Sequence, residues 1–368
     1  MRGLSVRGAH RRDRHSCRSI AATRRRPIVP SKRNEVLGQP TAGYSISILE
    51  ARRLGCRGAV CPRLSFSSHT RGMKDKTVPG WVKVPLVAGL CGWLLWRELR
   101  APARRSRESK TLHTARNLAM AGIAGLAVEY AEAPVALHLA RLTEKRRWGI
   151  LKWLSLPAWL EIPLAVLALD YTLYHWHRQC HKNRFLWRFH EPHHADLDMD
   201  ASTALRFHFG EVSLSVGWRA LQVVVIGVSP LAFSVWQTTL VLSILFHHSN
   251  VRLSAKSEGR LGNVLITPRM HAIHHSNVRE EADSNWSSSF SFWDRIHGTL
   301  RLDVPPEDLT IGVPAHSKPE DVTLSKVLEM PFVEQRPSWQ LPDGTLRITR
   351  ESAAGVTIDV APSDGLHP

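Results

Sequence analysis

A run of 27 residues without a charged side chain, from Ala220 to Phe246, constrains this chain more than any other feature. A helix needs about 20 mostly apolar residues to cross the hydrocarbon core of a membrane, and only this run meets that length cleanly. Gly227, Ser229 and Pro230 fall near its middle, so it forms either one kinked helix or a hairpin of two helices. Either interpretation predicts an integral membrane protein.

Three shorter apolar blocks precede this run: Val84–Trp96, Leu118–Val128 with an extension to Leu139, and Trp153–Leu169. They are short or carry carboxylates such as Glu129, so each crosses a membrane less convincingly than the long run. We expect an all-α integral membrane protein with about four to five membrane helices. The alternative is a soluble helical protein whose apolar helices are buried.

Most of the net charge of +17 comes from residues 1–72, which carry 16 Lys and Arg against three acidic residues. This Arg-rich segment has no apolar period and is expected to be disordered. It is a basic arm that binds nucleic acid or anionic lipid, an organelle transit peptide, or, as we prefer, a segment that is not translated because synthesis starts at Met73. Intact-mass measurement of the native protein tests this preference. The remaining +4 gives no reason to expect a nucleic-acid partner.

Twelve of the 20 histidines lie between His175 and His275, in motifs with helical spacing. HRQCH places two histidines four residues apart, and HEPHH and HAIHH each place one histidine three and four residues before a pair, so the imidazoles of each motif share a helix face. Imidazole is the commonest neutral metal ligand. The eight histidines are too many for one tetrahedral zinc and suit two metals with open positions: His177, His181, His190, His193, His194, His271, His274 and His275. A ninth, His248 or its neighbour His247, follows the long apolar run.

Isolated histidines on the surface need no function, and we expect six histidines to be of this kind. We assign none to His10, His15, His69, His113, His316 and His367, and we expect His175 to be structural.

The positions of the motifs decide how the long apolar run folds. A single crossing would leave the motifs before it and after it on opposite faces of the membrane. A shared metal site requires one face, which favours a hairpin of helices at about Val212–Val228 and Leu231–Phe246. The basic loop RELRAPARRSRESK, residues 97–110, should be cytoplasmic, and this places the motifs on the cytoplasmic side.

The order of the motifs over about residues 163–301 resembles the fatty acid hydroxylase (sterol desaturase) superfamily. The resemblance is carried by DYTLYHWHRQCHKNRFLWRFHEPHHAD, LRFHFGE, HHSNVRL, TPRMHAIHHS and DSNWSSSFSFWDRIHGT. It implies the eight ligands above, places His248 in the family's HSN-like segment, and adds His208 as a weaker tenth candidate. His297, where the family commonly has Phe, and Trp286-Ser287, where it has an aromatic residue and Gly, depart from the pattern outside this ligand set.

The resemblance implies a membrane enzyme that hydroxylates a lipid with two iron ions and O2. Zinc is the alternative metal, since imidazole suits both. The chain has no GxGxxG fingerprint, flavin motif or CxxCH haem site, so electrons should come from a separate ferredoxin or cytochrome-type donor with its reductase. Polar residues expected to support the ligands are Asp170, Arg178, Asp196, Asn285 and Asp294.

Two other functions stay open: desaturation of a lipid by the same kind of site, and a membrane protein that binds metal without turnover. A metal transporter is disfavoured because the histidines flank the apolar segments instead of lining a path through them. The sequence divides into a basic tail (residues 1–72), N-terminal membrane helices (73–162), a fatty acid hydroxylase-like domain (163–301) and a polar C-terminal tail (302–368). It does not indicate an oligomeric state.

Overall fold

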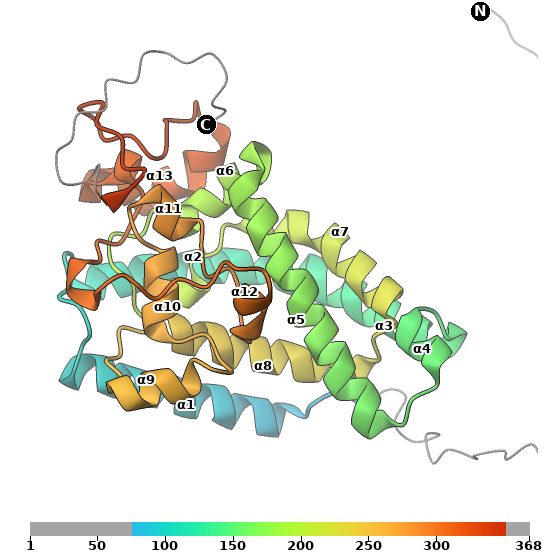
Figure 1. The fold of residues 1–368 in the computed structure, drawn as a ribbon. Helices are drawn as coiled ribbons and strands as arrows, with labels where there is room; N and C mark the ends of the chain where they lie inside the picture. The colour runs from blue at the N-terminus through green and yellow to red at the C-terminus, as the bar shows by residue number, and fades with distance from the viewer. Residues whose placement is uncertain (1–75, 351–368) are drawn as a thin grey trace, which may run out of the picture. The chain divides into compact units, whose positions relative to one another are not determined.

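The computed structural model describes residues 76–350, and these form a bundle of long helices with short helices and loops at one end (Figure 1). Within that range no β-strand forms, only isolated β-bridges. The helical class predicted from the sequence is therefore confirmed. The predictions for residues 1–72 lie outside the described residues.

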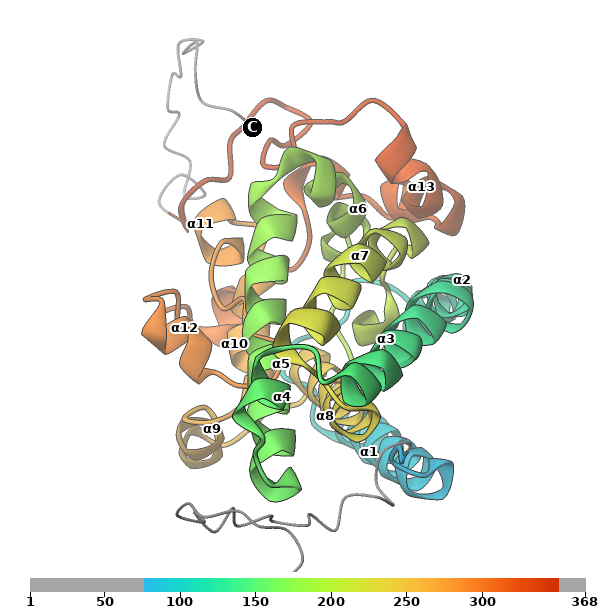
Figure 2. The same cartoon turned by 90° about the vertical axis from the view of Figure 1, so that its right-hand side faces the viewer.

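The long helices follow the predicted apolar blocks but extend beyond them. A π-helical turn, η2, joins α2 to α3 without a break in the helical path. Their bounds are α1 Gly80–Arg100, α2 Lys110–Ala127, η2 Val128–Glu132, α3 Ala133–Arg146, α4 Ile150–Leu154, α5 Ala158–Lys182, α7 Phe209–Ile226 and α8 Pro230–His248. Figure 2 shows α2, α3 and α7 on one side of α5, and the short helices α9 to α12 on the other.

Three segments of the described chain are long and apolar enough to cross a membrane: Lys110–Leu154, Phe209–Ile226 and Pro230–His248. The sequence predicted four to five crossings. Neither α1 nor α5 is among the three, because Lys83 and Arg97 interrupt α1, and Glu161 and Asp170 interrupt α5.

The predicted hairpin is formed by α7 and α8. Gly227 ends α7 with a left-handed φ of 84°, and the Ser229 hydroxyl accepts a hydrogen bond from the backbone N–H of Ala232 at the start of α8. A Cβ atom on Gly149 would lie 2.3 Å from the Cα of Gly227, so the turn before α4 packs directly on the hairpin turn. The start of α7 and the end of α8 consequently face the same end of the bundle.

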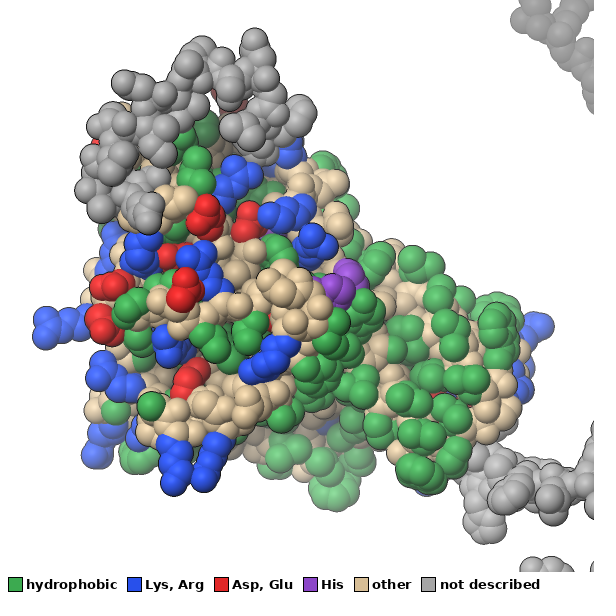
Figure 3. Space-filling view, viewed as in Figure 1, with side chains coloured by type: hydrophobic (Ala, Val, Ile, Leu, Met, Phe, Trp, Pro, Cys, Tyr) green, Lys and Arg blue, Asp and Glu red, His purple; other side chains and the backbone are tan. Residues whose placement is uncertain are grey.

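Large apolar side chains remain exposed along the helices. Trp81, Trp153 and Trp159 are each at least 75% exposed. Figure 3 shows hydrophobic side chains gathered over α4 and the start of α5, and charged side chains gathered at the opposite end of the molecule. A soluble monomer does not carry apolar surface on this scale. This distribution supports a membrane protein and counts against the soluble alternative.

Short elements build the charged end: α6 Arg184–His194, η3 Thr203–Leu205, α9 Ala255–Leu261, α10 Pro268–His274, α11 Arg279–Ala282, α12 Phe292–Ile296, η4 Pro306–Asp308, η5 Pro314–His316, η6 Pro319–Val322, α13 Leu324–Glu329 and η7 Met330–Phe332.

Within the predicted polar tail, residues 302–350 pack onto this end. Val313, Val322 and Val327 are almost completely buried, and the guanidinium of Arg350 pairs with Glu281 at 2.8 Å. These apolar residues are too few and too irregularly spaced to mark a packed segment in the sequence.

Candidate metal centre

Four helix ends carry nine histidines to one place. His177 and His181 lie in the last turns of α5, and α6 turns back from them because Asn183 caps its first turn. His248 ends α8, and the remaining ligand candidates lie on α6 and at α10: His190, His193, His194, His271, His274 and His275. The helical spacing of each motif aligns its imidazoles on one face, as predicted.

The nine histidines form two groups, and within each group one ring nitrogen from every member lies within 4.8 Å of the others. The first histidine group contains His177, His181, His190, His194 and His274, and the second contains His193, His248, His271 and His275. The groups touch, since the rings of His194 and His275 stack with centroids 4.1 Å apart. The arrangement suits two neighbouring cations.

The hydrogen bonds of His177 and His274 leave their facing nitrogens available to bind a cation. The Nδ1–H of His177 donates to the carbonyl oxygen of Trp286 at 2.7 Å, and that of His274 donates to the carbonyl oxygen of Ser284 at 2.8 Å. A carbonyl only accepts, so in both neutral rings the lone pair is on Nε2. These two Nε2 atoms lie 3.1 Å apart. Two facing lone pairs repel each other unless a positive ion lies between them.

The second group repeats this arrangement around His248. Its Nδ1–H donates to the carbonyl oxygen of Ile244 at 2.8 Å. Its Nε2 lies 3.1 Å from the Nε2 of His193 and 3.0 Å from that of His271. His248 therefore presents a lone pair to both neighbours. Of the two candidates, His248 has a ring nitrogen in the group and His247 does not, which favours His248.

Several buried ring nitrogens have no hydrogen-bond partner among the described residues: Nε2 of His181, His190 and His194, and both nitrogens of His275. Leaving such atoms unsatisfied costs about 1–3 kcal/mol each, which metal binding would remove. Burial and the neighbouring histidines hold the pKa values of His194 and His275 well below the usual range, and burial lowers the pKa of His274 to about 3. The rings of His194, His274 and His275 are thus neutral at pH 7, as ligands must be.

His208, the tenth candidate, lies outside both groups. Its Nδ1 accepts from the backbone N–H of Gly210 at 3.0 Å and caps α7, and its Nε2–H donates to the carbonyl oxygen of Leu328 at 3.2 Å. Both ring nitrogens are occupied by these hydrogen bonds, which give His208 a structural role in capping α7. His175 also lies outside the groups, beside the rings of Tyr171 and His297.

Residues 284–287, which we call the carbonyl loop, orient His177 and His274 through the backbone. The buried carboxylate of Asp294 holds this loop by accepting from the N–H groups of Trp286 and Ser287, both at 3.0 Å. Asn285, in a left-handed conformation with φ 51°, donates to the carbonyl oxygens of Met270 and Arg301. The predicted supporting roles of Asp294 and Asn285 thus have a structural basis. Trp286 and Ser287, which differ from the family pattern, are both part of the carbonyl loop.

Asp294→Asn should weaken metal binding. An asparagine can accept only one of the two loop N–H bonds with its oxygen, and its NH₂ group opposes the other N–H. Residues that support metal ligands typically contribute about 10–100-fold to affinity, so we expect a loss in that range. Chelator competition on the purified protein measures it. Asp303→Asn, a surface change with 67% of the side chain exposed, is the matched control, and equal affinities of the two variants would contradict the role of the loop.

Asp170 and Arg178 have other partners. Asp170 accepts from the indole N–H of Trp293 at 2.9 Å and so ties α5 to α12. The guanidinium of Arg178 lies 5.5 Å from the ring centroid of Trp286, on the carbonyl loop. Arg178 can therefore influence the first group through that loop.

The sequence analysis did not single out Glu211. Its carboxylate accepts from the Nδ1–H of His190 at 3.0 Å, and both side chains are buried. This contact fixes the His190 tautomer and directs its Nε2 toward the first group. The only signal in the sequence was the position of Glu211 in LRFHFGE, one of the segments that carry the family resemblance.

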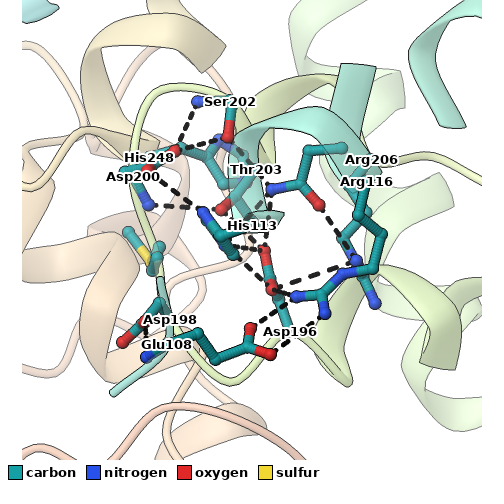
Figure 4. Close-up of polar contacts among 12 residues, drawn as sticks. Glu108, His113, Arg116, Asp196, Asp198, Asp200, Ser202, Thr203, Arg206 and His248 are labelled. Atoms are coloured by element: carbon teal, nitrogen blue, oxygen red, sulfur yellow. Dashed lines mark hydrogen bonds and ion pairs between the residues drawn. The ribbon is translucent and has the colours of Figure 1, made fainter. Parts of the chain in front are cut away.

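Asp196 is the centre of a buried ion network between α2 and the segment that follows α6 (Figure 4). One ring nitrogen of His113 lies 2.9 Å from Asp196 and the other 3.2 Å from Asp200. Arg206 is fully buried and donates to the carbonyl oxygen of Pro192, which lies between two candidate ligands on α6. Burial raises the pKa of Asp196, but Arg206 and His113 outweigh it and bring the pKa to about 2. The carboxylate is therefore charged at pH 7 and anchors the α6 segment.

Two histidines predicted to be isolated on the surface are buried, and those predictions are wrong. His113 is 1% exposed, and His316 is 8% exposed with its Nε2 3.6 Å from Glu191. Their burial depends on long-range packing, which spacing in the sequence does not reveal. His10, His15, His69 and His367 lie outside the described residues.

Residues 162–299 match the fatty acid hydroxylase family, and this range contains every member of both histidine groups. This part of the chain is a fatty acid hydroxylase domain, and the curated relatives support the same superfamily. The hydroxylase domain is not self-contained, however. His113 reaches it from α2, and the N–H of Gly312 donates to the carbonyl oxygen of His275 at 3.1 Å.

Curated relatives share the hydroxylase domain at modest identity. Ornithine lipid hydroxylase OlsE of Rhizobium tropici is 29% identical over 43% of this chain and 46% of its own length. Human alkylglycerol monooxygenase is 29% identical over 44% of this chain and 34% of its own length. Mouse cholesterol 25-hydroxylase is 27% identical over 44% of this chain and 57% of its own length. The chain thus spans about a third to just over half of the length of these relatives. No solved structure matches it significantly.

Proposed function

We propose that this chain is a membrane-bound, non-haem di-iron oxygenase that hydroxylates a lipid. The observation that carries the proposal is the pair of touching histidine groups with converging ring nitrogens, inside a fatty acid hydroxylase domain. The relatives named above are a lipid hydroxylase, an alkylglycerol monooxygenase and a cholesterol hydroxylase, which supports a lipid substrate.

Each histidine group would hold one iron ion. When bound, the two ions would supply the O2 chemistry that breaks an unactivated C–H bond, which no side chain can perform. The protein itself orients the rings through the carbonyl loop and Glu211, and burial of the site limits access of water. Zinc remains the alternative occupant on donor chemistry alone. Electrons would come from a separate ferredoxin or cytochrome-type donor with its reductase, so turnover by the purified chain should depend on adding such a pair.

The active site is proposed to face the cytoplasm. The basic loop of residues 97–110 lies beside the residues that follow His248, since the N–H of Ala103 donates to the carbonyl oxygen of Asn250 at 2.9 Å. The loop and the second histidine group therefore share one membrane face, and basic loops favour the cytoplasmic face. In a chain without other cysteines, Ser106→Cys should resist a membrane-impermeant maleimide in intact cells, whereas Lys145→Cys should react. The reverse pattern would overturn the orientation.

Product mass tests the reaction. The full chain is expressed with a donor and reductase, and cellular lipids are compared with those from a His274→Ala control. Hydroxylation adds about 16 mass units to one lipid class, and desaturation removes about 2. A mass gain of about 16 units that is absent from the His274→Ala control supports the proposal. A loss of two units would assign the desaturase function instead, and bound metal with no changed lipid would leave the non-catalytic alternative.

A further inference from the structure

A cavity of about 700 Å³ opens on the charged end of the molecule and is separate from both histidine groups. Its walls come from the basic loop at residues 103–107, from residues 197–199 after α6, from residues 250–253 after α8, and from residues 306–311. We call it the basic pocket. Residues from α9 and the start of α10 complete it.

The basic pocket adjoins three ligand-bearing segments. Its wall includes Asn250, two residues after His248, Leu197, three residues after His194, and Pro268, three residues before His271. The candidate membrane span Pro230–His248 ends just before this wall. The pocket therefore lies at the level where a lipid headgroup would meet the protein.

Positive charge dominates the lining. Five arginines face three carboxylates: Arg104, Arg105, Arg107, Arg252 and Arg269 against Asp198, Glu258 and Glu307. Two carboxylates are already engaged, because Asp198 accepts from the backbone N–H groups of Arg107 and Glu108, and Glu258 accepts from the Thr267 hydroxyl. The exposed guanidiniums of Arg105 and Arg107 have no ion-pair partner among residues 76–350.

Two arginines show that this charge is poorly compensated within the protein. Burial lowers the pKa of Arg104 to about 10 despite the nearby carboxylates of Asp198, Glu98 and Asp200. The buried Nε of Arg269 has no hydrogen-bond partner in the described part of the chain, although its Nη2 donates to the carbonyl oxygen of Leu302. An anion in the pocket would stabilise both guanidiniums.

We propose that the basic pocket binds the phosphate headgroup of an anionic membrane lipid. Its volume falls within the range of about 300–1,000 Å³ that holds small ligands, whereas a protein partner needs a broad contact surface. Guanidinium groups match phosphate oxygens with paired hydrogen bonds. Basic pockets beside the cytoplasmic ends of membrane helices bind phospholipid headgroups. This site is independent of the oxygenase reaction and would exist in a chain without turnover.

Thermal unfolding of the full chain in detergent tests the proposal with short-chain phosphatidylglycerol as the probe. The midpoint temperature should rise saturably with phosphatidylglycerol and not with phosphatidylcholine of the same chain length. In Arg105→Gln/Arg107→Gln the half-saturating concentration should rise roughly fivefold, because two unpaired charges are removed. Lys256→Gln/Arg260→Gln removes the same charge from exposed positions on α9 that do not line the pocket, and should match the wild type.

Each other outcome overturns the proposal. Equal shifts with the two lipids, or equal responses of the two double variants, would show that the pocket does not select an anionic headgroup. An equal shift from inorganic phosphate at the same concentration would assign the pocket to a soluble phosphate compound and not to a lipid. Unchanged metal content in the pocket variant confirms that it is folded, so a negative result cannot be attributed to misfolding.

Discussion

His274→Ala is expected to abolish lipid hydroxylation and to remove about half of the bound metal. His274 belongs to the first histidine group, and its Nε2 lies 3.1 Å from that of His177. Loss of a residue that merely supports a ligand costs about 10–100-fold, so loss of a ligand should exceed about 100-fold in turnover. The second group keeps its four histidines and should keep its ion. Elemental analysis and product formation, measured on the same preparation, check both parts.

His138→Ala is the matched control, because His138 is exposed on α3 and belongs to neither group. It should retain wild-type metal content and activity. Full metal content and activity in His274→Ala would rule out His274 as a ligand. Loss of all metal would show instead that the two groups bind as one coupled unit.

Asp196→Ala is expected to lower the free energy of unfolding by about 3–5 kcal/mol, because it leaves Arg206 and His113 buried without their shared carboxylate. Asp196 and Arg206 are fully buried, and His113 is 1% exposed. The network also links α2 to the segment after His194, so metal binding should weaken together with stability. Denaturant unfolding of chelated protein in detergent isolates the stability effect from the metal.

Asp303→Ala is the control for this prediction, because it removes an exposed carboxylate instead of a buried one. Its side chain is 67% exposed, and its ion pair with Arg301 lies on the surface. Such pairs contribute about 0–1 kcal/mol, so this variant should unfold almost as the wild type does. A similar cost for both variants would mean that the buried network contributes no more than a surface pair.

Features that depend on spacing between nearby residues were predicted correctly from the sequence. The three histidine motifs and the hairpin at Gly227 were both recoverable, because helical periodicity places side chains and turn residues mark a reversal. A hairpin places the histidine motifs that precede it and follow it at the same end of the bundle. In the structure His193, before the hairpin, and His248, after it, lie in the same histidine group. The helices α1 and α5 are long enough to cross a membrane but not apolar enough, because polar residues interrupt both.

Contacts between distant segments could not be predicted from spacing. The carbonyl loop acts through backbone oxygens, which have no signature in residue type. His113 lies 83 positions before its partner Asp196, and without a partner in view an isolated histidine suggests a surface residue. The structure places His208 outside both histidine groups, and a histidine in a family segment can cap a helix as well as bind a metal.

Metal content of the full chain, purified from membranes without chelators, tests the central claim most directly. Two histidine groups predict about two iron ions per chain. Less than one bound ion per chain would contradict a dimetal centre, and two zinc ions with no iron, in protein expressed with ample iron, would contradict an oxygenase.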